Sequence, residues 1–143
     1  MTLHCPVTLL LVGHDDGPLD DEANTRLRRQ AKALWTQRIA AVYAVPGRAA
    51  DVGHLAAQEL GVSCHVAEGL DQGGMHEVLQ GIADLYRGER VLVVGSDALW
   101  ARGLPGLAVD RSGRAGEWGQ VRLDAPVPLE IGDEGWTILP AQT

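Results

Sequence analysis

The stretch Val91-Leu92-Val93-Val94-Gly95-Ser96-Asp97 decides the fold of this chain. Its first four residues are all apolar, a composition typical of a strand buried on both faces of a parallel sheet. Near the N-terminus, the apolar run Thr8-Leu9-Leu10-Leu11-Val12 ends in a similar way, in Gly13-His14. Because ligands bind at the carboxyl ends of parallel strands in open α/β sheets, the two polar ends together predict a site.

Helix and strand signals alternate between and around these two stretches. Asp20 or Asp21 can cap a first helix, whose apolar residues recur at helical spacing as far as 34. A second helix, from about Arg48 to Leu60, ends at Gly61. The other expected elements are a strand over 41–45, a strand over 62–66 and a third helix, ended by Gly88, with the apolar stripe Met75, Val78, Leu79, Ile82 and Leu85. This order predicts an α/β fold, a three-layer αβα sandwich with a mainly parallel central sheet.

The last third of the chain departs from this alternation. Six glycines and prolines between 103 and 119 exclude a helix longer than a turn or two. Apolar residues then alternate along 127–131, and Trp136 and Ile138 follow after the turn Gly132-Asp133-Glu134-Gly135. This pattern predicts a C-terminal antiparallel hairpin with one buried face, added at an edge of the sheet, where Pro128 is tolerated.

Length and composition limit the classes of protein that the chain can be. With 143 residues, 45% of them hydrophobic, it is long enough for one domain, residues 1–143, and too short for two ordinary ones. A net charge of −7 and a pI near 5.1 argue against nucleic acid or an anionic membrane as a partner, and of the arginines only Arg26, Arg28 and Arg29 are clustered. No apolar run spans a bilayer, no leader peptide is recognisable, and Cys5 and Cys64 make no disulfide scaffold, so we expect a bacterial-type cytoplasmic protein.

Four segments of the chain carry a family resemblance. The first is Leu11-Val12-Gly13-His14-Asp15-Asp16-Gly17, where members of the family have a strand followed by Arg-His-Gly-Glu-Thr, and the second is Leu27-Arg28-Arg29-Gln30-Ala31, similar to a helix segment that ends in Gln-Ala. The third is Tyr43-Ala44-Val45-Pro46-Gly47-Arg48-Ala49, similar to Tyr-Ser-Ser-Pro-Leu-x-Arg-Ala with one residue missing. The fourth is 91–97, where family members have a strand and then Ser-His-Gly or Gly-His-x. On these residues the sequence resembles the histidine phosphatase superfamily, also called phosphoglycerate mutase-like, over roughly Val7 to Leu104. In length it is most similar to the short bacterial phosphohistidine phosphatases.

The resemblance implies a chemistry and assigns residues to it. In the family, a neutral histidine attacks phosphorus, two arginines and a second histidine hold the phosphoryl oxygens, and a carboxylic acid protonates the leaving oxygen. Carried over to this chain, His14 is the catalytic nucleophile, Arg48 is one of the phosphate-binding arginines, and Glu68 or Asp71 is the acid.

Two positions of this set depart from the family. Gly13 stands in place of the other arginine, and Ser96 stands in place of the second histidine. A phosphate-clamping arginine contributes on the order of a thousandfold to turnover. In addition, Asp15 and Asp97 would repel an incoming dianion. We therefore expect a catalytically inactive, histidine phosphatase-like domain with a binding or regulatory role.

Three functions remain open. In the first, the cleft over His14, Arg48 and Ser96 takes a small anionic ligand or nothing at all. The alternative is an active but divergent phosphomonoesterase, which hydrolyses phosphohistidine or a small phosphate ester with His14 as nucleophile. In the third, the tryptophan-rich C-terminal hairpin forms a homo-oligomer and matters more than the cleft.

The acidic residues near the site allow plainer interpretations. Arg48 can pair with Asp15, Asp16 or Asp51 instead of a phosphate. The acidic residues before the first helix lack the spacing of a calcium loop, and no histidine and cysteine spacing matches zinc. No glycine-rich phosphate loop follows a strand. The sequence therefore predicts neither a cofactor nor a metal.

Overall fold

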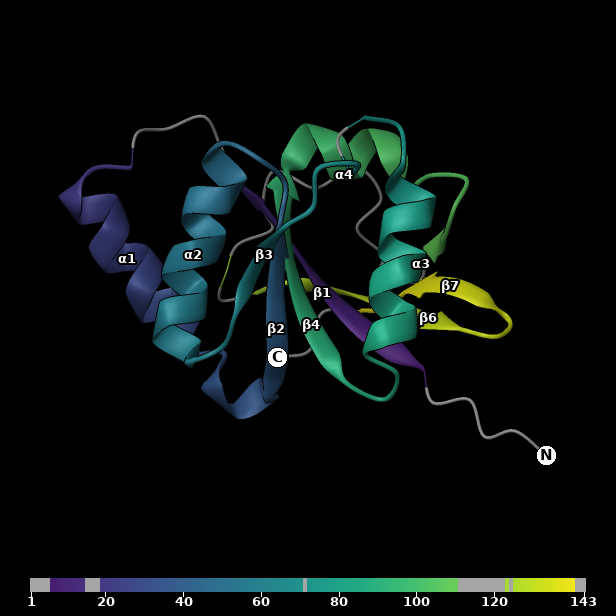
Figure 1. The fold of residues 1–143 in the computed structure, drawn as a ribbon, viewed down its shortest axis with the longest axis horizontal. Coiled ribbons are helices and arrows are strands. Elements are labelled where there is room, and N and C mark those ends of the chain that lie inside the picture. The colour runs from purple at the N-terminus through teal and green to yellow at the C-terminus, as the bar shows by residue number, and fades with distance from the viewer. Residues whose placement is uncertain (1–5, 15–18, 71, 111–122, 124, 141–143) are drawn as a thin grey trace.

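The computed structural model of the chain describes residues 6–14, 19–70, 72–110, 123 and 125–140, with the backbone alone at His14 and Asp110. Its strands are β1 (Val7–His14), β2 (Ile39–Ala44), β3 (Cys64–Val66), β4 (Arg90–Ser96), β5 (Val109–Asp110), β6 (Val127–Gly132) and β7 (Gly135–Ile138). Its helices are α1 (Asp21–Lys32), α2 (Arg48–Leu60), α3 (Met75–Leu85), α4 (Asp97–Gly103) and the 3-10 turn η1 (Trp35–Gln37). Strands and helices alternate from β1 to β4 (Figure 1), as the sequence predicts, and α4 is a further helix after β4.

The described strands form one sheet in the order β3-β2-β4-β1-β6-β7-β5. β4 lies between β1 and β2 and runs parallel to both, and its residues from Val91 to Val94 are each 0% exposed. A strand enclosed on both sides and both faces meets only apolar neighbours, which is why its sequence shows no alternation. The mainly parallel sheet predicted from the sequence is confirmed.

Helices cover both faces of the sheet (Figure 1). α1 and α2 pack together on one face, and α3 lies on the other. Right-handed crossovers explain this division. The chain moves outward from β1 to β2 and on to β3, and then returns from β3 to β4, so the connecting helix changes face. The three-layer architecture is therefore also confirmed.

Capping residues set the ends of the first two helices. Asp20 precedes α1, and its Oδ1 accepts a hydrogen bond of 2.8 Å from the backbone N–H of Ala23. α2 has the predicted bounds and ends before Gly61, whose φ of +69° is a left-handed conformation that glycine adopts readily. Every helix in the described part of the chain is too short or too polar to cross a lipid bilayer.

Two details differ from the predicted elements. Leu85 is 73% exposed, although the sequence places it on the buried stripe of α3. At about 100° per residue, the stripe that includes Leu79 and Ile82 continues to the partly buried Tyr86, and Leu85 lies about a quarter-turn to one side. The third strand is also shorter than expected, because only Cys64–Val66 forms a ladder with β2.

The predicted C-terminal hairpin extends the sheet beyond β1. The buried side chains of the hairpin include Leu129, Ile131 and Trp136. β6 is antiparallel to both β1 and β7. β6 is therefore an inner strand, flanked by β1 and β7, and β5 lies at the edge of the sheet. Pro128 fits there because its carbonyl faces β7 and accepts a hydrogen bond of 2.9 Å from the Leu139 N–H. In a strand, the nitrogen and carbonyl of one residue point to the same side, so Pro128 removes no bond from the ladder with β1.

Candidate functional site

The carboxyl ends of the parallel strands meet at one edge of the sheet, where the sequence predicts the site. Gly13 of β1 is paired in register with Gly95 of β4, and His14 is paired with Ser96. The structure therefore brings three of the predicted site residues, Gly13, His14 and Ser96, side by side along the backbone.

A carboxylate occupies the space beside Gly13. A Cβ added to Gly13 would collide with Asp97 Oδ1 and would lie 2.9 Å from Asp97 Cγ and 3.4 Å from its Cα. Because real Cβ contacts essentially never fall below 3.0 Å, no side chain fits at position 13 while Asp97 keeps this position. Gly13 is not among the described glycines with a positive φ. Close approach, and not backbone conformation, therefore accounts for glycine at this position.

Helix α4 holds Asp97 in this place. Ser96 is its N-cap, and Ser96 Oγ accepts a hydrogen bond of 3.1 Å from the N–H of the third helical residue. The indole of Trp100 is fully buried, and its Nε1 donates to the carbonyl oxygen of Val12 at 2.9 Å. The same ring covers Gly95, where an added Cβ would lie 2.9 Å from Trp100 Cζ2. α4 is thus anchored to the ends of both β1 and β4.

The Ser96 hydroxyl can still donate a hydrogen bond to a ligand. Its oxygen serves α4 as an acceptor. A serine hydroxyl has one donor and two acceptor positions, so the O–H can still donate to an oxygen at the sheet edge.

The other predicted site residues lie farther along this edge. Arg48 is half-buried at the first position of α2, the helix that follows β2. Glu68 is exposed in the turn after β3. Neighbouring strands lie about 4.8 Å apart, and β4 and β2 separate β1 from β3, so the backbones of Glu68 and His14 are roughly 14 Å apart. The structure therefore places Arg48 at the start of α2, after β2, and leaves Glu68 at the far edge.

Several residues discussed from the sequence lie outside the described residues. They include Asp71, the second candidate acid, and Asp15 and Asp16, two candidate partners of Arg48. The third candidate partner, Asp51, is exposed in the first turn of α2. Within the described residues, no group of three or more histidine, cysteine, aspartate or glutamate side chains is arranged to hold a metal ion.

Sequence reasoning missed the contact between Trp100 and β1. The Trp100 side chain of α4 is fully buried. The bond from Trp100 to Val12 joins residues 88 positions apart, so no local pattern reveals it. The sequence feature that could have indicated close packing at this place is the pair of glycines, Gly13 and Gly95, each of which immediately precedes the last residue of its strand.

Two titratable groups elsewhere on the sheet have raised pKa values. Burial and the hydrogen bond of 3.4 Å between the Tyr43 and Tyr86 hydroxyls raise the pKa of Tyr43 to about 12. Burial also raises the pKa of the Cys64 thiol, which faces α2 at Gly53. Both groups are kept in their neutral forms, so neither is an activated nucleophile.

Comparisons with known proteins bear on this architecture. No protein-family model and no curated protein matches the chain. Solved structures match it over nearly its whole length. Bacillus stearothermophilus YhfR aligns with a TM-score of 0.64 and 13% identity, covering 93% of this chain and 94% of that one. A mycobacterial glucosyl-3-phosphoglycerate phosphatase aligns with a TM-score of 0.63 and 11% identity, covering 97% and 100%. A protein of Agrobacterium tumefaciens classed with the phosphohistidine phosphatase SixA aligns with a TM-score of 0.62 and 10% identity, covering 99% and 100%.

The chain has the histidine phosphatase fold. This finding confirms the fold that the sequence resemblance implies. At these identities the likeness concerns the fold alone, and the chemistry of this histidine phosphatase-like chain has to be argued from its own residues.

Proposed function

We propose that this chain is a histidine phosphatase-like protein that does not transfer phosphoryl groups and acts by binding. One observation carries the proposal: the Asp97 carboxylate lies where a side chain at position 13 would begin. The family chemistry requires an arginine at that position to hold the phosphoryl oxygens. Here the space is closed to an arginine and is lined by a carboxylate instead.

The exchange of a cation for a carboxylate opposes phosphoryl transfer in two ways. It removes a clamp that contributes on the order of a thousandfold to turnover. It also sets a carboxylate beside an incoming dianion, and like charges repel.

Phosphatase assays test the absence of catalysis. Hydrolysis of p-nitrophenyl phosphate and of a phosphohistidine peptide is measured for the wild-type protein and for His14→Ala. We expect the same background rate for both proteins. A wild-type rate that disappears in His14→Ala would overturn the proposal.

A gain-of-binding variant tests the reason for this inactivity. Combining Gly13→Arg with Asp97→Gly removes the carboxylate and supplies the missing cation in one step. We expect this double variant to bind inorganic phosphate at least about tenfold more tightly than the wild type, since charge-assisted hydrogen bonds to phosphate are strong. Unchanged phosphate affinity in a folded double variant would contradict the electrostatic argument.

The binding role rests on the groups that remain at this edge. Arg48 begins α2, where the guanidinium and the positive end of the helix dipole both favour an anion. The Ser96 hydroxyl can donate to the same ligand. Calorimetric titration with inorganic phosphate and with sulfate, for the wild type and for Arg48→Ala, tests this role. Binding that depends on Arg48 supports it, and equal binding by both proteins refutes it.

An active phosphomonoesterase is the second candidate function. The observation that favours it is the register that sets Ser96, with its donor hydroxyl, directly beside His14. In this candidate His14 attacks phosphorus, Arg48 and Ser96 hold oxygens, and Glu68 or Asp71 protonates the leaving oxygen. Detection of phosphate on His14 by mass spectrometry, after incubation with a phosphate donor, would establish this function in place of the first.

A further inference from the structure

The basic residues of the chain are concentrated in one segment that the proposed function does not use. Residues 26–38 hold five of the 12 lysines and arginines and none of the 19 acidic residues, although the whole chain has a net charge of −7. The segment covers most of α1, the turn η1 and the residue after it. All five basic side chains are exposed, namely Arg26, Arg28, Arg29, Lys32 and Arg38.

Neighbouring acids neutralise only part of this charge. Glu59 of α2 pairs with Arg28 at 2.9 Å and, more loosely, with Lys32 at 3.9 Å. The remaining three arginines of the segment form no ion pair with any residue that the structure describes. Their guanidinium groups are therefore available to a partner.

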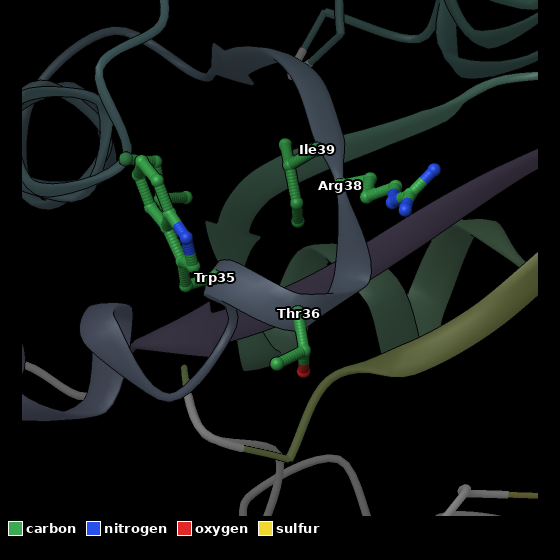
Figure 2. Close-up of a pocket in the computed structure, with 5 residues that line it drawn as sticks. Trp35, Thr36, Arg38 and Ile39 are labelled. Atoms are coloured by element: carbon green, nitrogen blue, oxygen red, sulfur yellow. The ribbon is translucent and has the colours of Figure 1, made fainter.

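A partly apolar pocket, with Arg38 among its lining residues, adjoins the C-terminal end of this segment. It has a volume of about 490 Å³ and is lined by Trp35, Thr36, Arg38, Ile39 and Leu60. Ile39 begins β2 and Leu60 ends α2, so the pocket lies at the end of the sheet opposite the predicted phosphate site. In Figure 2, the Trp35 indole and the Ile39 side chain stand on opposite sides of a gap, and Arg38 extends away from Trp35. Trp35 is 65% exposed, which is high for the largest apolar side chain.

Arg38 occupies a backbone conformation that favours glycine. It caps η1 with φ of 55° and ψ of 55°, and it is the one described residue other than glycine with a positive φ. Glycine would adopt this conformation without steric strain, whereas arginine does not. A left-handed residue commonly ends a helical turn, as Arg38 ends η1, and strained residues also cluster at ligand-binding sites.

We propose that this surface, formed by α1, η1 and the adjoining pocket, binds a short acidic segment of a partner protein. The carboxylates of that segment pair with the three arginines, and one bulky apolar side chain enters between Trp35 and Ile39. Tryptophan and arginine are among the residues that most often dominate protein interfaces, and here Trp35 and Arg38 both line the pocket. This inference does not depend on the proposed function, because the two sites lie at opposite ends of the sheet.

A long polyanion fits the surface less well than a short acidic segment. The basic residues of α1, from Arg26 to Lys32, span roughly 9 Å along the helix. At its N-terminal side, α1 begins with Asp21 and Glu22 and is capped by Asp20. Nucleic acid or an anionic membrane is larger than this segment, so it would extend beyond the arginines and be repelled by these carboxylates. All 19 acidic residues of the chain lie outside the segment.

Peptide selection tests the proposal. A random peptide library displayed on phage is selected on the full-length protein, and the affinities of the enriched peptides are measured by fluorescence anisotropy. We expect these peptides to combine several acidic residues with one aromatic or large aliphatic residue. We expect Trp35→Ala to weaken their binding about thirtyfold and Arg29→Glu about tenfold.

Matched variants separate binding from folding. Arg38→Gly suits the backbone at this position and deletes only the guanidinium, so it should fold normally and bind about tenfold more weakly. Arg102→Glu reverses an exposed charge on α4 and should leave affinity unchanged. A lack of enriched peptides, peptides without acidic residues, or equal binding by Trp35→Ala would overturn the proposal. Binding of single-stranded DNA or of phosphatidylserine vesicles that Arg29→Glu abolishes, without peptide binding, would assign the surface to a different partner and would also overturn it.

Discussion

Replacing Gly13 by alanine tests whether the Asp97 carboxylate fills the space beside β1. The added Cβ would collide with Asp97 Oδ1, and because α4 itself is anchored through Ser96 and Trp100, the Asp97 side chain has to rotate to make room. Overpacking of a closed site costs about 1–3 kcal/mol. We therefore expect Gly13→Ala to lower the free energy of unfolding by about 2 kcal/mol, which corresponds to a decrease in Tm of roughly 4–8 °C for a domain of this size.

A double-mutant cycle with Asp97→Ala provides the decisive comparison. Without the carboxylate there is room for a methyl group, so in that background Gly13→Ala should cost less than about 0.5 kcal/mol. The coupling between the two positions is then about 1.5 kcal/mol. Urea denaturation followed by circular dichroism measures all four proteins. An equal cost of Gly13→Ala in both backgrounds would refute the placement of Asp97 beside β1.

Other predictions concern stability and titration away from this contact. Trp100→Phe leaves the Val12 carbonyl without the indole donor and should lower the free energy of unfolding by about 1–2 kcal/mol, whereas Trp136→Phe, which loses a bond of 3.2 Å to the Gln80 side chain, should cost less; urea denaturation of the two variants compares them. Arg38→Gly should raise the free energy of unfolding by roughly 0.5 kcal/mol by relieving a left-handed backbone, and Arg38→Val should lower it, as calorimetry will measure. Leu79→Ala should cost about 2–5 kcal/mol and Leu85→Ala less than about 0.5, and similar losses would contradict the packing of α3. The phenolate absorbance of Tyr43 should appear only near pH 12, and Tyr86→Phe should move that titration toward the ordinary pKa of 10.0. Because folding raises this pKa, the stabilisation is present below pH 10 and is lost as the pH rises from about 10 to about 12; a Tyr43 titration that Tyr86→Phe does not change would contradict the coupling.

The main elements of the fold could be predicted because their signals are local. The apolar run from Val91 to Val94 identifies a buried parallel strand, and Asp20 and Gly61 are adjacent to the helix ends that they cap. The exposure of Leu85 depends on how α3 is turned toward the sheet, which helical spacing alone does not determine. The inner position of β7 depends on its pairing with β5, a contact between separate segments that no local sequence pattern reveals.

The location of the candidate site could be predicted from the sequence, but the contacts within it could not. Two strand ends, Gly13-His14 and Gly95-Ser96, are enough to indicate the edge of the sheet. The contact of Asp97 with Gly13 depends instead on the direction in which α4 leaves β4, and the bond between Trp100 and Val12 helps to set that direction. The basic segment is also visible in the sequence. Its pocket is not, because residues from three separate elements line it.

The anchoring of α4 also bears on how the sequence of such a protein can change over generations. An arginine introduced at position 13 alone meets the Asp97 carboxylate and destabilises the strand end, and loss of Asp97 alone adds no cation. Neither single substitution brings a catalytic advantage, so selection acting one step at a time has no favourable first step toward a phosphate clamp. On the proposed function, the packing of one short helix therefore acts against a return of phosphoryl transfer.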